Sequence, residues 1–304
     1  MERNYMESRY IHRQLTTALV LSASFIGPLV AQTKTEALTV QDPRPLSALA
    51  AEIEKRTGVP INYEDVRYEN AADVRDVTDS IMSPEQKAQA LPGVRVIVPN
   101  GGGLTTSISV NSTGSFPDVA SASAALAGAL NAYHTSPAFR ARFTVSTGDG
   151  VLYIQPTQMR DATGQIKAVT PVLAAPITLE RQTRSGLETL DILAKQLSKT
   201  SGYRVEVGTV PLRAMIASQV TIGSDNESAA TVVTRLLVAV AAASGGGAGG
   251  PALSYAMLFD PRQAFYVINV HPVPNPNPAS SLRTLPISKP ASVDGVYFKQ
   301  PPAK

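Results

Sequence analysis

One helix–turn–strand pattern occurs twice in this chain, and it limits the possible fold more than any other feature. The copies span residues 45–64 and 189–208, so that Gly58 and Gly202 lie 144 positions apart. The apolar positions coincide, and their spacings of three and four place them on one helix face: Leu46 with Leu190, Leu49 with Leu193, Ala50 with Ala194, Ile53 with Leu197, and Ile61 with Val205. The shared glycine ends each helix, because glycine takes left-handed backbone angles without a Cβ clash. The repeat predicts two similar domains, as a chain of 304 residues allows.

Each copy continues with the same order of elements: strand, helix, strand, strand, helix and hairpin. This order predicts an α+β fold, with helices on one face of a small sheet. The first module spans residues 37–156 and carries an insertion, 64–104, while the second spans residues 177–270. Residues 157–176 are polar and contain proline, and we interpret them as a linker. The predicted closing hairpins are 143–145 with 151–154, across a Gly-Asp-Gly turn, and 253–259 with 264–270.

The two ends of the chain read as segments outside these modules. Residues 1–14 are polar and contain three arginines, residues 15–30 are apolar, and Ala31 is a suitable cleavage residue. This pattern predicts a secretory signal peptide over residues 1–31, removed before Gln32, with no membrane span after its removal. An uncleaved membrane anchor is the alternative. Residues 271–304 are rich in proline and lack periodicity, which predicts a disordered tail.

Composition excludes several classes of function. The chain has no cysteine, so thiol catalysis and thiolate metal sites are ruled out. The net charge is only +3, tryptophan is absent and no basic run occurs, so we expect no nucleic-acid partner. Export without disulfides fits a periplasmic or secreted bacterial protein.

Patterns that carry catalytic or ligand chemistry are nearly absent. Of the histidines outside the signal, His134 has only Ser136 near it in sequence and His271 has no serine close by, so we expect neither to be catalytic. Residues 245–250 match a dinucleotide-binding glycine pattern, but they follow a helix instead of opening one, which favours a flexible loop. Asp73, Asp76 and Asp79 favour a solvated acidic face, relieved by Arg67 and Arg75, over a metal site. We therefore expect no catalytic, cofactor-binding or metal-binding residues.

The repeated pattern resembles the short N-terminal domain shared by secretins and TonB-dependent receptors. The resemblance rests mainly on the second module: Leu190, Leu193, Ala194, Leu197, Gly202, Val205, Val220, Ile222, Leu236, Leu237 and 266–268. It implies protein–protein contact in the periplasm, in secretion assemblies or in signalling. No barrel or secretin pore region follows the modules, so the closer likeness is to stand-alone exported proteins that carry such domains.

These observations favour a non-enzymatic binding or assembly protein of the bacterial envelope. We expect it to bind an envelope partner, or itself, through sheet edges, of which 143–145 or 253–259 should be the most exposed. An envelope polysaccharide-binding protein is the alternative, with Tyr63, Tyr68 and Tyr133 as candidate contacts. An unrecognised hydrolase is a third possibility.

Overall fold

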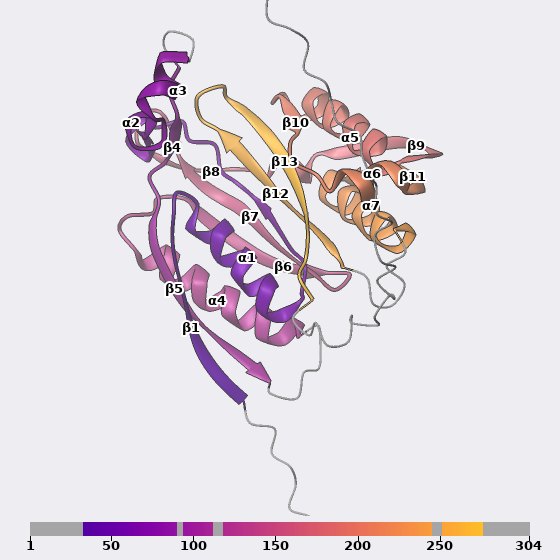
Figure 1. The fold of residues 1–304 in the computed structure, drawn as a ribbon, viewed down its shortest axis with the longest axis horizontal. Helices are drawn as coiled ribbons and strands as arrows, with labels where there is room; N and C mark the ends of the chain where they lie inside the picture. The colour runs from indigo at the N-terminus through magenta and orange to yellow at the C-terminus, as the bar shows by residue number, and fades with distance from the viewer. Residues whose placement is uncertain (1–32, 90–93, 112–117, 245–250, 276–304) are drawn as a thin grey trace, which may run out of the picture. The chain divides into compact units, whose positions relative to one another are not determined.

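The computed structural model describes residues 33–89, 94–111, 118–244 and 251–275. Helices pack on a seven-stranded mixed sheet that both repeats share, so the predicted α+β class is confirmed (Figure 1). The predicted signal, the glycine-rich segment 245–250 and most of the predicted tail lie outside the described residues. Among the helices that the structure describes, none has the length and apolar character needed to cross a bilayer.

The first module contains a two-stranded ribbon, two helices and three strands of the large sheet. The ribbon pairs β1 (Thr33–Asp42) with β5 (Gly102–Asn111) in antiparallel fashion, and α1 (Pro45–Thr57) and α4 (Val119–Thr135) pack against it. The three sheet strands are β2 (Ile61–Glu64), β6 (Arg142–Gly148) and β7 (Val151–Arg160).

The second module repeats this arrangement. Its ribbon pairs β9 (Pro176–Ser185) with β11 (Gln219–Ser228), and its helices are α5 (Gly186–Ser201) and α7 (Ala229–Ala243). Its sheet strands are β10 (Val205–Val207), β12 (Leu253–Asp260) and β13 (Phe265–Pro272). A short helix, α6 (Leu212–Ala217), was not expected from the sequence, because six residues give too little periodicity to detect.

The predicted helix ends are confirmed. Gly58 and Gly202 follow α1 and α5 with φ angles of 67° and 75°, in the left-handed region. Asp118 and Ser228 cap α4 and α7 by accepting the N–H of the residue three positions later. The start of α1 has no side-chain cap, since Asp42 accepts the N–H of Arg44, ahead of the helix, and Pro45 begins the helix.

The two modules join edge to edge within one sheet. The strand order is β10–β13–β12–β2–β7–β6, and the joint is the parallel pair β12–β2. The modules keep separate apolar cores, because successive residues of a strand face opposite sides. In β7, Leu152 and Ile154 lie in the first core, whereas Tyr153 between them packs against the second. The helices of the two modules therefore cover opposite faces of the shared sheet.

The insertion 64–104 has its own small elements. They are η1 (Ala71–Asp73), β3 (Val74–Asp76), α2 (Thr78–Ile81), α3 (Pro84–Gln89) and β4 (Ile97–Pro99). Proline suits the first turn of a helix, and α3 begins at Pro84.

The predicted linker, 157–176, also contains secondary structure. It includes the end of β7, then β8 (Ile166–Ala168), which pairs with β7, and η2 (Val172–Ala174). Val172 and Leu173 are buried in the second core. The polar, proline-containing composition therefore did not reveal that this stretch forms regular elements that contact both modules.

Candidate functional site

The joint between β12 and β2 is the most polar buried region in the described part of the chain. Ala256 lies opposite Tyr63 and Met257 lies opposite Glu64 in parallel register. The Asp65 N–H donates to the Met257 carbonyl at 2.9 Å, which extends the ladder by one residue. A parallel pair this short supplies few backbone hydrogen bonds, so side chains must hold the modules together as well.

Asp65 is the centre of those side-chain contacts. Its buried carboxylate accepts the Arg44 Nε–H at 2.6 Å and the hydroxyls of Tyr63 and Tyr68 at 3.0 and 2.6 Å. Arg44 donates in turn to the Phe259 carbonyl at 2.6 Å, across the joint. Burial, with the Asp65 charge beside them, raises the pKa of both tyrosines well above its ordinary value, so both remain neutral donors.

Two further polar side chains of β2 reach the second module. The Asn62 side chain donates to Thr234 Oγ1 at 3.0 Å and accepts the Tyr255 N–H at 3.1 Å. Glu64 accepts the N–H groups of Val172 and Leu173 at the start of η2. Burial raises the pKa of Glu64 to about 8, although those two N–H groups act in the opposite direction.

A cavity of about 550 Å³ lies beside this joint, lined by Glu64, Arg67, Lys167, Tyr203 and Tyr266 among others. Its charged groups already have partners within the chain. Glu69 pairs with Arg67 at 3.2 Å and with Lys167 at 2.8 Å, and the Arg67 guanidinium lies 4.6 Å from the centre of the Tyr203 ring. These contacts make the cavity wall part of the joint.

The structure brings His271 to a serine that sequence adjacency did not reveal. Ser254 Oγ lies 3.0 Å and Glu54 Oε2 lies 2.8 Å from His271 Nε2. This is not a catalytic triad, because both partners contact the same ring nitrogen, whereas a relay needs one on each nitrogen. Ser254 is also fully buried, and Glu54 is fixed by the Ile61 N–H at 2.7 Å.

His134 likewise has a structural contact. Its Nε2 accepts the backbone N–H of Phe143 at 3.1 Å, which requires the ring to be unprotonated at that nitrogen. Burial, followed by the nearby Arg142 charge, lowers the pKa of His134 and favours that form.

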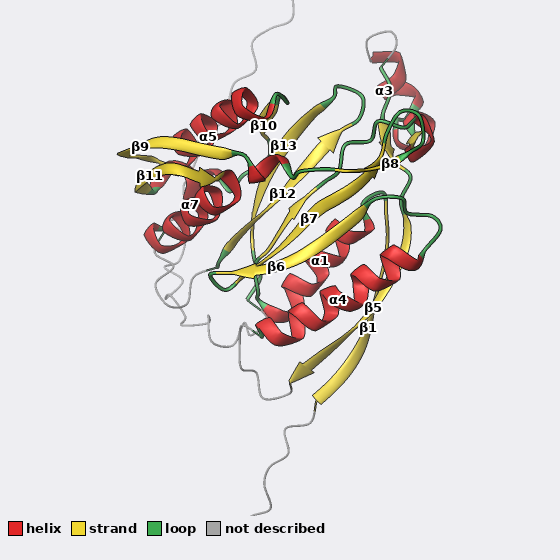
Figure 2. Ribbon diagram, turned by 180° about the vertical axis from the view of Figure 1, so that it is seen from behind, coloured by secondary structure: helices red, strands yellow, loops and turns green. Residues whose placement is uncertain are grey.

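Strand β6 forms one edge of the seven-stranded sheet, and β10 forms the other (Figure 2). The expectation that 143–145 lies at an edge is therefore confirmed. The same expectation for 253–259 is wrong, because β12 pairs with β13 on one side and β2 on the other. The hydrophobic pattern of a hairpin does not show which of its strands receives a further neighbour.

The backbone of β6 points hydrogen-bonding groups outward. Phe143 lies opposite Pro156, which has no N–H, and its own N–H donates to His134, away from β7. Since alternate residues of an antiparallel strand point the same way, the N–H and C=O of Val145 also point away from β7. No strand pairs with this side of β6 in the residues that the structure describes.

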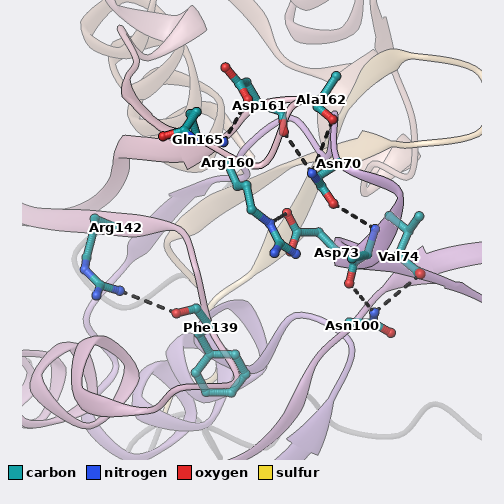
Figure 3. A network of polar contacts seen from close by, with 11 residues as sticks. Asn70, Asp73, Val74, Asn100, Phe139, Arg142, Arg160, Asp161, Ala162 and Gln165 are labelled. Atoms are coloured by element: carbon teal, nitrogen blue, oxygen red, sulfur yellow. Dashed lines mark hydrogen bonds and ion pairs between the residues drawn. The ribbon is translucent and has the colours of Figure 1, made fainter.

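The acidic face predicted at residues 73–79 has different partners from those expected. Asp73 is half-buried and pairs with Arg160 of β7, whose Nε lies 3.0 Å from Asp73 Oδ2 (Figure 3). Asp76 lies 3.7 Å from Arg95. The pairing of Asp73 with Arg160 attaches the insertion to β7. Within the described ranges, no group of three or more acidic or histidine side chains could hold a metal ion.

The tyrosines considered for sugar contact are largely inside the protein. Tyr63 and Tyr133 are buried in the first core, and the Tyr68 hydroxyl is bound to Asp65. They form no exposed aromatic surface.

The chain matches no protein-family model, no curated protein and no solved structure. Its functional interpretation therefore depends on the geometry described above.

Proposed function

We propose that this chain is an exported, non-enzymatic binding or assembly protein of the bacterial envelope, and that it binds a protein partner by adding a strand to β6. The observation that carries the proposal is the outward direction of the Val145 backbone at a sheet edge. An extended peptide aligned with such an edge gains main-chain hydrogen bonds, the usual basis of strand addition.

The side chains of β6 support the same function. β6 begins with the charged Arg142, but its remaining residues, 143–148, contain no charge and no proline, the two features with which proteins usually protect an edge from pairing. Thr144, Ser146 and Thr147 are exposed, and Val145 is half-buried. The edge is therefore accessible and compatible with an incoming strand.

The histidine geometry favours binding over hydrolysis. His134 and His271 each use Nε2 for contacts within the chain, and the serine beside His271 is buried. The polar joint is likewise occupied by contacts between the two modules. The resemblance to periplasmic interaction domains and the predicted signal over residues 1–31 agree with an envelope role.

The decisive experiment compares Val145→Pro with Val145→Ala in a pull-down from envelope extract. Proline removes the outward N–H, while alanine keeps it and removes only side-chain atoms. We expect the wild-type chain and Val145→Ala to retain the same partner and Val145→Pro to lose it. Thermal melts must show that the proline variant remains folded. Unchanged binding by a folded proline variant would exclude this edge.

Export has its own test. N-terminal sequencing of the protein recovered from the periplasm should begin near Gln32. Recovery of an intact Met1 in the cytoplasmic fraction would refute export.

The non-enzymatic role has a separate test. Catalytic turnover by the wild-type chain that is lost in His134→Ala or in His271→Ala would refute it.

A further inference from the structure

The repeat makes each strand of one module equivalent to a strand of the other. β2 and β10 follow the repeated helix and glycine, and each pairs in parallel with the last strand of its closing hairpin. In register, Ile61 opposite Leu152 corresponds to Val205 opposite Tyr266, and Tyr63 opposite Ile154 corresponds to Val207 opposite Ile268. β6 therefore corresponds to β12, with Val145 in the place of Met257.

The joint inside the chain pairs two strands that each have a counterpart in the other module. β12 of the second module pairs in parallel with β2 of the first. The two strands left at the sheet edges are β6, the counterpart of β12, and β10, the counterpart of β2. The two free edges of the sheet are thus the counterparts of the two strands that form the internal joint.

We propose that a second copy of this chain adds its β10, in parallel, to the β6 edge and so repeats the internal joint between molecules. This inference rests on the proposed function and names its partner. Thr144 would lie opposite Val207 of the second copy, as Ala256 lies opposite Tyr63. The Thr209 N–H is the counterpart of the Asp65 N–H, which donates to the Met257 carbonyl. Within the chain the Thr209 N–H donates to Asn269 Oδ1 at 2.9 Å, so it would have to exchange that acceptor for the Val145 carbonyl of the neighbouring copy.

The local chemistry at both edges suits this pairing. The Tyr255 N–H, which points toward β2, is taken by Asn62, and the corresponding Phe143 N–H is taken by His134. Both donors are thus satisfied outside the ladder. Gly208, which would face Val145, is exposed and has no side chain to obstruct an approaching strand. The charges near β10 neutralise each other, because Arg204 pairs with Glu206.

The placement of the helices also permits the contact. The strands of the first module run opposite to those of the second, in the same lateral order, so their helices cover opposite faces. A second copy joined at β6 would place its α5 and α7 on the face opposite α1 and α4 of the first copy. The exposed Thr144 side chain would then become partly covered, just as the Ala256 side chain is partly covered at the internal joint.

The resulting assembly is open, because the two surfaces in contact are different. Each added copy presents a fresh β6 or β10 edge, so growth continues beyond a dimer. The joint between copies has no counterpart of Asn62, Glu64 or Asp65, since Glu206, Gly208 and Thr209 occupy those places. We therefore expect it to be weaker than the internal joint and to depend on concentration.

Single cysteines test the register, since the natural chain contains none. Two full-length variants with tags of different size, Thr144→Cys and Val207→Cys, are mixed and oxidised. Directly opposed residues of neighbouring strands lie about 5 Å apart, within reach of a disulfide. We expect the mixed disulfide between the two variants to predominate. Thr183→Cys on exposed β9 replaces Val207→Cys as the matched control and should give little product.

Each other outcome has a defined meaning. Predominant Thr144→Cys homodimers would overturn the inference in favour of a two-fold pairing of β6 with itself. Absence of the mixed disulfide at the highest soluble concentration would also overturn it. If Val145→Pro still loses its envelope partner in that case, the proposed function stands and only the identity of the partner fails. Light scattering should show growth beyond dimers for the wild-type chain and its loss in Val145→Pro.

Discussion

The two modules have the same order of helices and strands, and they differ in the side-chain contacts of the equivalent strands β2 and β10. Ser198 accepts the Val205 N–H at 2.8 Å, and Glu54, at the corresponding position, accepts the Ile61 N–H at 2.7 Å. Only Glu54 also reaches the other module, through His271.

The residues within and just after β2 and β10 also differ between the modules. The first module has the buried residues Asn62, Glu64 and Asp65, whereas the second has Glu206, Gly208 and Thr209 at or near the surface. The comparison teaches that repeated apolar residues build each module, while residues that are not repeated join the modules.

The largest expected effect comes from removing the centre of the joint. Asp65→Ala leaves the Arg44 guanidinium without its carboxylate partner in a largely buried position, so we expect unfolding free energy to fall by about 3–5 kcal/mol. Thr209→Ala is the matched control in the second module and should change it by about 0.5 kcal/mol or less. Chemical denaturation measures both. Equal effects of the two substitutions would refute the distinction between the modules.

Core substitutions test whether the modules unfold together. Leu193→Ala and Leu49→Ala remove corresponding side chains that are 2% and 0% exposed, so each should lower the unfolding free energy by about 2–5 kcal/mol. Independent folding of residues 177–270 remains a prediction. If it holds, calorimetry will show two transitions, each lowered by only one of the substitutions. A single transition lowered by both would show that the shared sheet couples the modules.

Glu64 should make stability depend on pH. Its pKa in the folded chain, raised by burial to about 8, exceeds the ordinary value of 4.5, so the folded state holds the proton more tightly than the unfolded state. Unfolding free energy should therefore fall as pH rises from about 4.5 through 8. We expect Glu64→Gln to flatten this slope in denaturation curves measured across that range. A slope unchanged by the substitution would contradict the assignment.

The smallest effect is expected at Asn62. Asn62→Ala leaves the buried Tyr255 N–H without its acceptor, which should cost about 1–3 kcal/mol. Thr234 keeps the Tyr153 hydroxyl at 3.0 Å, so its hydroxyl is not left without a partner. Glu206→Ala supplies the comparison in the second module, and thermal melts should show almost no change for it. A larger effect there than at Asn62 would contradict the unequal roles of β2 and β10.

The local elements of both modules followed from the sequence. Apolar spacing located the four long helices, the two glycines marked where α1 and α5 end, and Asp149-Gly150 marked the turn between β6 and β7. These features depend on neighbours within a few residues, so a single sequence carries enough information to find them.

The polar joint was missed for a different reason. Residues 61–64 alternate apolar and polar side chains, a pattern that ordinarily places the polar residues in solvent. In the folded chain both faces of β2 are covered, one by each module, so Asn62 and Glu64 are buried. A comparison of the two copies could have pointed to these residues, because Glu206 and Gly208 of the second copy replace Asn62 and Glu64 of the first.

The sequence by itself determined the repeated modules, their helices and most of their strands, because backbone preference and apolar periodicity act over short separations. Only the tertiary structure decided that β12 joins β2, that Ser254 and Glu54 meet His271, and that β6 and β10 remain at the edges. Strand pairing joins residues nearly 200 positions apart in this chain, as between Tyr63 and Ala256. Several strands with similar apolar patterns could occupy the place beside β2, and the choice among them depends on packing and buried hydrogen bonds that form only when the whole sheet assembles.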